Sequence, residues 1–210
     1  LHRFAARFAG LPVRNSGTLG GNVANGSPIG DSMPLLIALG AQVELASTRG
    51  SRSLPLEDLY TGYRQNVMAA DELLTFSHVP LPRTGEQLAA YKVSKRGDDD
   101  ISAVCLALRL TVADGTITQV RIGAGGVAAT PVRAQQTEAA LQGQPWTEAT
   151  VQQAMRVLQA EFSPISDMRA SGDYRRTVLG NLLQRFWLES QGGAPASIAQ
   201  LQASHLEDVL

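Results

Sequence analysis

Residues 14–40 read RNSGTLGGNVANGSPIGDSMPLLIALG, and they decide how the rest of the chain is interpreted. Gly17, Gly20 and Gly21 have no side chains, which permits left-handed turns and lets a ligand approach the main-chain amides. Successive amide N–H groups form an anion site that suits a diphosphate and needs no cation, and Arg14 is the only cation in the stretch. The glycines therefore indicate a loop that binds a phosphorylated ligand.

Polar residues within the same stretch support that interpretation, but each also has an ordinary one. Thr18 and Asn22 offer hydrogen bonds without charge, and Asp31 precedes an apolar run where it can accept from a sugar hydroxyl. Glycine with Ser, Asn and Pro is equally typical of a plain turn, and Asp is a common helix N-cap. The spacing matches neither the P-loop nor the dinucleotide fingerprint, so the residues alone leave both readings open.

Composition limits the classes of protein. The chain has 210 residues, which is enough for one sizeable domain or two small ones. Its net charge is near −1. The charge argues against nucleic-acid binding and against polybasic attachment to a membrane. No apolar run approaches the roughly 18 residues of a spanning helix, and the N-terminus does not resemble a signal sequence. We therefore expect a cytoplasmic protein.

Metal and nucleophilic sites are not indicated. Cys105 is the only cysteine, so the chain cannot hold an iron–sulfur cluster, which typically needs four thiolates. It lies in the apolar segment ISAVCLALRL, where we expect a buried, inert thiol. His2, His78 and His205 are dispersed without metal-ligand spacing, and no Ser/His/Asp arrangement indicates a hydrolase.

The pattern of apolar residues predicts mixed secondary structure. Phe4 and Phe8 are spaced to share one face of a short helix. The first part of the chain then predicts a hairpin, a turn with a short helix, and a strand, at residues 42–54, 56–69 and 72–82. RTGEQ follows as a linker. Beyond it the pattern predicts three strands, with a turn at Asp114-Gly115, and then three helices, the last beginning at Asp173.

Several motifs resemble one known family. The segment GTLGGNVANGSPIGDSMPLLIALGA resembles the second flavin-binding segment of the FAD domain in molybdenum hydroxylases, above all the small subunit of bacterial xanthine dehydrogenases. The resemblance continues, in the family's order, through LEDLYTGYRQNVMAADELLTFSHVPLP, YKVSKRGDDDISAV and IGAGGVAATPVRA, to about Glu189.

The resemblance implies an α+β fold. It consists of part of a two-subdomain FAD-binding domain, followed by a three-stranded antiparallel sheet with helices, like the C-terminal domain of carbon monoxide dehydrogenase flavoproteins. The implied boundaries are 1–82 for the FAD-binding part, 87–190 for the second domain and 191–210 for a tail to which no role is assigned.

The resemblance also implies a cofactor site without a catalytic side chain. The aromatic ring of Phe8 would lie against the flavin, the backbone of Leu73 and Leu74 would line its edge, and Lys92 would contact it. The full implied set is Phe8, Gly17, Thr18, Gly20, Gly21, Asn22, Asp31, Leu73, Leu74 and Lys92. The loop KRGDDD, residues 95–100, is either a solvated turn or a charged wall beside the flavin; its carboxylates would oppose the anionic reduced ring that Lys92 favours.

The implied function is the FAD-binding part of a xanthine dehydrogenase-like enzyme of purine catabolism. Electrons would pass from iron–sulfur clusters through FAD to NAD, with a molybdopterin-binding large subunit and an iron–sulfur domain as partners. The family's earlier diphosphate-binding segment is expected to belong to this unit and to precede Leu1. The alternatives are the flavin module of a carbon monoxide dehydrogenase or aldehyde oxidoreductase, and a scaffold subunit without cofactor.

Overall fold

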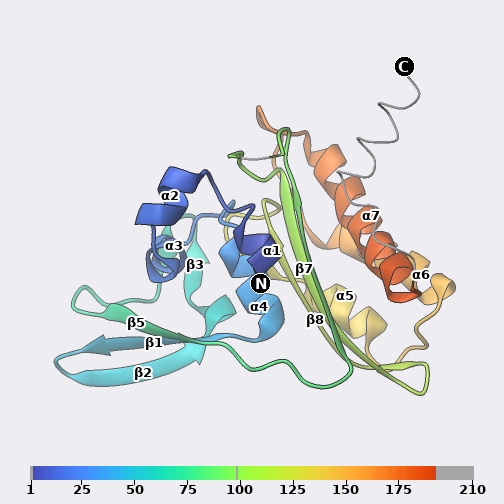
Figure 1. Cartoon of the computed structure of the whole chain (residues 1–210), viewed down its shortest axis with the longest axis horizontal. Helices are drawn as coiled ribbons and strands as arrows, with labels where there is room; N and C mark the ends of the chain where they lie inside the picture. The colour runs from blue at the N-terminus through green and yellow to red at the C-terminus, as the bar shows by residue number, and fades with distance from the viewer. Residues whose placement is uncertain (1, 98, 193–210) are drawn as a thin grey trace.

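Two β-sheets lie side by side with a short buried helix between them (Figure 1). The structure, a computed structural model, describes residues 2–97 and 99–192. The helix is α4, Ser32–Leu39, and every residue from Met33 to Leu39 is buried because both halves pack around it. A uniformly apolar helix is expected only where all of its faces are covered. The α+β class predicted from the sequence is confirmed.

The N-terminal half places three short helices beside a small antiparallel sheet. The strands follow the order β2-β1-β5, and β1 pairs with both neighbours. The predicted hairpin and the strand after it are confirmed. The bounds are α1 His2–Ala5, α2 Leu11–Ser16, α3 Leu19–Asn25, β1 Gln42–Ser47, β2 Gly50–Pro55 and β5 Leu73–His78.

Residues 56–69 differ from the prediction of a turn with a short helix. A single 3-10 turn, η1 at Leu56–Asp58, leads into a two-stranded ribbon of β3, Tyr60–Gly62, and β4, Gln65–Asn66. The hydroxyl of Tyr60 donates to the carbonyl oxygen of Val23 at 2.9 Å, which ties the ribbon to α3. Strands of two or three residues are too short to show the alternation on which a prediction rests.

The C-terminal half contains a larger antiparallel sheet in the order β6-β7-β8-β9. The three predicted strands are confirmed, and a fourth strand of two residues extends the edge. Asp114 and Gly115 both have positive φ, as a tight hairpin turn between β7 and β8 requires. The bounds are β6 Glu86–Val93, β7 Val104–Ala113, β8 Thr116–Gly125 and β9 Val132–Arg133.

Both faces of this sheet are covered, which explains the nearly continuous apolar sequence of β7. Leu106, Leu108 and Leu110 belong to the cluster formed with the C-terminal helices, whereas Ala107 packs with α4 on the opposite face. The helices are α5 Gln135–Leu141, α6 Glu148–Glu161 and α7 Gly172–Ser190. The last of them begins one residue before the predicted Asp173, because the hydroxyl of Ser171 accepts from the amide of Tyr174 and caps it.

Close packing of α4 on β8 depends on two glycines of the segment IGAGG. A Cβ at Gly123 would overlap the carbonyl oxygen of Pro34, and a Cβ at Gly125 would lie 2.8 Å from Cγ of Pro34. Neither glycine has a positive φ, so glycine is needed here because α4 comes close to β8 and not because of the backbone conformation.

Gly123→Ala is expected to destabilise the chain by about 1–3 kcal/mol, because α4 must move away from the sheet to admit the methyl group. Gly97→Ala is a matched control, since a Cβ there meets nothing within 4 Å and its φ is not positive. Denaturant unfolding of both variants measures the difference. Equal midpoints for the two would contradict this account of the packing.

Two further expectations from the sequence concern the domain boundaries and membrane-spanning helices. The division into 1–82, 87–190 and 191–210 stays a prediction, and residues 193–210 of the tail lie outside the described residues. Among residues 2–97 and 99–192, no helix is both long and apolar enough to cross a bilayer.

Candidate functional site

A cavity of about 290 Å³ lies where the N-terminal segments meet the end of β6 and the connection from β6 to β7. Four residues from the predicted set line it together, although they are far apart in the sequence: Phe8, Asn22, Asp31 and Lys92. Its volume is at the lower end for small-molecule sites, so it suits one ring system and not an entire dinucleotide. The remaining lining residues are Ala9, Asn25, Ser27, Ile29, Gly30, Asp99, Asp100 and Ile101.

A buried ion pair forms part of the cavity wall. Lys92 Nζ lies 2.7 Å from Asp31 Oδ2, and the two side chains are only 5% and 6% exposed. Ser102 Oγ donates to the other carboxylate oxygen, and Lys92 Nζ also donates to the carbonyl oxygen of Arg7 at 3.1 Å. Asp31 precedes α4, but its side chain makes no cap hydrogen bond and is committed to this pair. The carboxylate thus balances the ammonium charge at the wall.

The aromatic residue of the cavity lies outside the first helix. Helix α1 ends at Ala5, so Phe4 and Phe8 do not share one helical face as the spacing predicted. Phe4 packs against the apolar cluster of α4, whereas Phe8 lines the cavity. Arg7 Nη1 donates to the carbonyl oxygen of Lys92 at 3.0 Å, so this segment is attached directly to β6. Phe8 and Lys92 therefore line the same cavity, on segments that are bonded to each other through Arg7.

The glycines at 17, 20 and 21 do not form the expected left-handed turns. Gly17 ends α2 with φ −76°, and the other two lie inside α3. The left-handed glycines of the stretch are Gly26 and Gly40, which end α3 and α4. The amide of Gly17 donates to the carbonyl oxygen of Val13, and the amide of Gly21 donates to the hydroxyl of Thr18, so these two amides are already bonded within the chain.

These three glycines differ in what an added side chain would meet. A Cβ at Gly17 would lie 2.9 Å from the carbonyl oxygen of Val13, and a Cβ at Gly21 would lie 2.9 Å from Thr18 Oγ1. A Cβ at Gly20 would meet only Leu74 Cδ2, at an ordinary 3.8 Å. The fold therefore accounts for Gly17 and Gly21 but gives no steric reason for glycine at position 20, which is the observation expected where a ligand approaches the backbone.

Leu73 and Leu74 begin β5 next to α3 but do not line the cavity. Leu74 packs against the apolar cluster of the N-terminal half, which includes Val23 and Val43, whereas 71% of Leu73 is exposed. The segment before them is anchored because Arg52 forms a two-pronged ion pair with Glu72, at 2.7 and 2.8 Å. This pair and the amide of Ala69 hold the pKa of the Glu72 carboxyl at about 2. The start of β5 is thus fixed whether or not a ligand lies against it.

The described part of the loop after Lys92 closes over one end of the cavity. The carboxylate of Asp99 lies so near Gly10 that a Cβ there would be 2.8 Å from Asp99 Cγ. Hydrogen bonds from the main-chain amides of Arg96 and Ile101 lower the pKa of Asp100. Lys95 Nζ donates to the carbonyl oxygen of Met168 at 2.7 Å, which attaches the loop to the segment before α7. Lys95, Arg96 and Gly97 are exposed, so this part of the loop is solvated, whereas Asp99 and Asp100 also contribute charge to the cavity wall.

The thiol of Cys105 is buried, as predicted, and only 1% of the residue is exposed. It lies 3.8 Å from the carbonyl oxygen of Asp31. Burial, and then the nearby negative charge of Asp31, raise the pKa of this thiol, so the nucleophilic thiolate is disfavoured.

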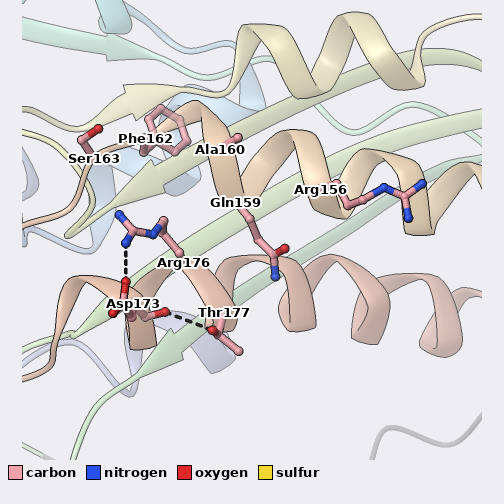
Figure 2. Close-up of a pocket in the computed structure, with 8 residues that line it drawn as sticks. All are labelled: Arg156, Gln159, Ala160, Phe162, Ser163, Asp173, Arg176 and Thr177. Carbon is pink, nitrogen blue, oxygen red and sulfur yellow. Dashed lines mark hydrogen bonds and ion pairs between the residues drawn. The ribbon is translucent and has the colours of Figure 1, made fainter.

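A larger open hollow of about 580 Å³ lies between α6 and α7 and does not form a convergent site. Figure 2 shows Arg176 directed at Asp173, with which it forms an ion pair, whereas Arg156 points away from both. The hollow therefore contains no cluster of groups aimed at one ligand. Within residues 2–97 and 99–192, no three His, Cys, Asp or Glu side chains are placed to hold a metal ion.

Sequence reasoning missed the residues that support the site. Ser102 binds Asp31 across 71 positions, and Arg7 binds Lys92 across 85. Ser102 lies within the motif YKVSKRGDDDISAV but was given no role there, and Arg7 lies outside the quoted motifs, so only the fold reveals these contacts. The cavity, an aromatic ring, a buried cation and Gly20 fit a large planar cofactor with a phosphate tail.

Comparison with protein families gives two matches that follow one another along the chain. A model of the FAD binding domain in molybdopterin dehydrogenases matches residues 1–82. A model of the C-terminal domain of carbon monoxide dehydrogenase flavoproteins matches residues 89–190.

Known proteins agree with these matches. The chain is 38% identical to a nicotinate hydroxylase of Emericella nidulans and 34% identical to a xanthine dehydrogenase/oxidase of Gallus gallus, in each case over 86% of this chain and 14% of the relative. It is similar to a solved carbon monoxide dehydrogenase of Hydrogenophaga pseudoflava, with a TM-score of 0.81 and 31% identity over 85% of this chain and 62% of that one. The chain thus spans less than two thirds of each of these relatives.

Proposed function

We propose that this chain, which belongs to the flavoprotein family of molybdenum hydroxylases, binds FAD in the cavity between Phe8 and Lys92 and passes electrons to NAD. One observation supports the site above all: Phe8, Asn22, Asp31 and Lys92 come from four separate segments and line one cavity. When bound, FAD would supply the redox chemistry, taking electrons from iron–sulfur clusters of a partner and giving a hydride to NAD.

The residues of this chain would bind and orient the cofactor. Phe8 offers an aromatic face for stacking with a planar ring. Lys92 would bring an ammonium group to the ring, held in place by Asp31 and Ser102, and the carboxylates of Asp31, Asp99 and Asp100 at the same cavity would oppose its effect on a negative ring. The first turn of α3, where Gly20 lacks a side chain, belongs to the same helix as Asn22 of the cavity lining, and the rest of the cofactor would extend along it.

The partners belong to the same proposal. A molybdopterin-binding large subunit, an iron–sulfur domain and the first segment of the FAD domain would complete the assembly. The chain spans 62% of the carbon monoxide dehydrogenase chain, which leaves room in such relatives for that segment. We propose that the assembled enzyme oxidises a xanthine-like substrate and acts in purine catabolism in the cytoplasm.

An anaerobic titration of the native flavoprotein tests the proposal. Its visible spectrum should show bound flavin, and extraction should release FAD. NADH added without any substrate of the molybdenum centre should bleach the flavin band, because hydride transfer between FAD and NAD is reversible. Bound FAD that NADH does not bleach would overturn the NAD assignment and favour a carbon monoxide dehydrogenase or aldehyde oxidoreductase type. A native protein without flavin, unable to bind added FAD, would be a scaffold.

A further inference from the structure

The turn that presents Phe8 to the cavity is organised by one side chain from the next helix. Arg14 lies in α2, Leu11–Ser16, and its guanidinium Nη1 donates to the carbonyl oxygen of Phe8 at 2.9 Å and to that of Ala9. Its main-chain amide donates to the carbonyl oxygen of Gly10 at 3.1 Å. The side chain of Arg14 thus serves the two successive carbonyls of residues 8 and 9, whereas the bond to residue 10 comes from its backbone and belongs to the first turn of α2.

This turn has a conformation that its sequence does not favour. Ala9 has φ 46°, in the left-handed region where a Cβ is close to the backbone and where glycine is normally found. Gly10 follows with an extended backbone, and the carboxylate of Asp99 occupies the space where its Cβ would be. Hydrogen bonds from outside the turn are therefore needed to hold Ala9 in this conformation.

The opposite end of the segment is fixed independently. Arg7 and Lys92 exchange hydrogen bonds, from Arg7 Nη1 to the carbonyl oxygen of Lys92 at 3.0 Å and from Lys92 Nζ to that of Arg7 at 3.1 Å. The ring of Phe8 is thus located by an anchor on β6 before it and by Arg14 after it. Without Arg14, the carbonyls of Phe8 and Ala9 would lose these hydrogen bonds, while the anchor on β6 and the bond from the Phe8 amide to Ala5 would remain.

We propose that Arg14 is a positioning residue, which sets the place of Phe8 in the cofactor cavity by holding the left-handed turn at Ala9. This inference rests on the proposed FAD site and deepens it. The competing role for the only cation of residues 14–40 is to bind the cofactor's diphosphate directly. The two roles differ in what can replace Arg14: a positioning role can be met by relieving the strain at Ala9, whereas an anion-binding role needs another cation.

The experiment compares four versions of the native flavoprotein: wild type, Arg14→Ala, Arg14→Lys and the double variant Arg14→Ala/Ala9→Gly. Arg14→Ala should weaken FAD binding by roughly five- to thirty-fold, the factor that corresponds to an uncompensated left-handed alanine. The double variant should bind within about threefold of wild type, because glycine adopts positive φ at little cost. Arg14→Lys should bind as weakly as Arg14→Ala, since a single ammonium cannot serve two carbonyls in the same fork.

The visible circular dichroism of the bound flavin gives a second readout, because it depends on the aromatic group beside the ring. Arg14→Ala should lose part of this signal and the double variant should regain it. Gln153→Ala, an exposed change on α6, is the control for both readouts. If Arg14→Lys restores affinity and Ala9→Gly does not, Arg14 is an anion ligand and the proposal fails.

Amide hydrogen exchange on the cofactor-free protein separates this proposal from the FAD assignment. Exchange at the amides of residues 8 and 14, which donate to the carbonyl oxygens of Ala5 and Gly10, should accelerate in Arg14→Ala and return toward wild type in the double variant, whether or not FAD binds. Unchanged exchange would overturn the positioning role even if FAD binding is confirmed. A wild-type protein that binds no FAD, but shows the expected exchange pattern, would instead contradict the proposed function.

Discussion

Asp31→Asn is expected to destabilise the chain by about 3–5 kcal/mol and to abolish FAD binding at micromolar concentrations of cofactor. The substitution leaves the ammonium of Lys92 buried with a side chain only 5% exposed and without its carboxylate. Denaturant unfolding of the cofactor-free protein measures the loss of stability. Asp71→Asn is the matched control, because its ion pair with Arg49 is exposed and should contribute less than about 1 kcal/mol.

A double variant separates stability from binding at the same pair. Asp31→Asn combined with Lys92→Met removes both charges, so most of the lost stability should return. FAD affinity should not return, because the cation that faces the cavity is gone. A double variant that binds FAD as tightly as wild type would show that the pair only stabilises the fold.

Gly20→Ala is expected to lower FAD affinity by about tenfold or more while leaving the fold intact or slightly more stable. The new methyl would contact only Leu74 Cδ2, and alanine is favoured over glycine in a helix by up to about 1 kcal/mol. The affinity should fall because the methyl occupies the space over the first turn of α3 that the cofactor needs. Isothermal titration with FAD and thermal unfolding measure the two effects.

Gly21→Ala should behave differently and serves as the comparison. Its Cβ would lie 2.9 Å from Thr18 Oγ1 and would disturb the cap of α3, so stability should fall by about 1 kcal/mol. If Gly20→Ala loses stability in the same way and binds FAD normally, the glycine serves the fold and not the cofactor.

Much of the fold was predictable because its signals are local. The hairpin of β1 and β2 follows from alternating residues around Arg49-Gly50, and the strand pair β7 and β8 follows from the turn at Asp114-Gly115. The short β3–β4 ribbon was not predictable, since two- and three-residue strands leave no pattern. The position of α7 differed by one residue, because Ser171 and not Asp173 supplies the cap.

Four of the ten residues predicted for the site lie together at one cavity, and the cofactor role of the whole set stays a prediction. The motif order placed Phe8, Asn22, Asp31 and Lys92 in one set, and the structure brings these four to one cavity. The reason for the glycines was wrong in part, because positions 20 and 21 lie in a helix. The supporting bonds of Ser102, Arg7 and Arg14 depend on contacts that arise only after folding, so no spacing in the sequence reveals them.

The central claim is that the cavity between Phe8 and Lys92 receives the flavin ring of FAD. An experimental structure of the native flavoprotein with bound FAD tests it most directly. The ring is expected inside the cavity, against Phe8 and within reach of Lys92 Nζ, with the phosphates over Gly20. A flavin bound elsewhere, with the ring of Phe8 and the ammonium of Lys92 both out of contact with it, would contradict the account.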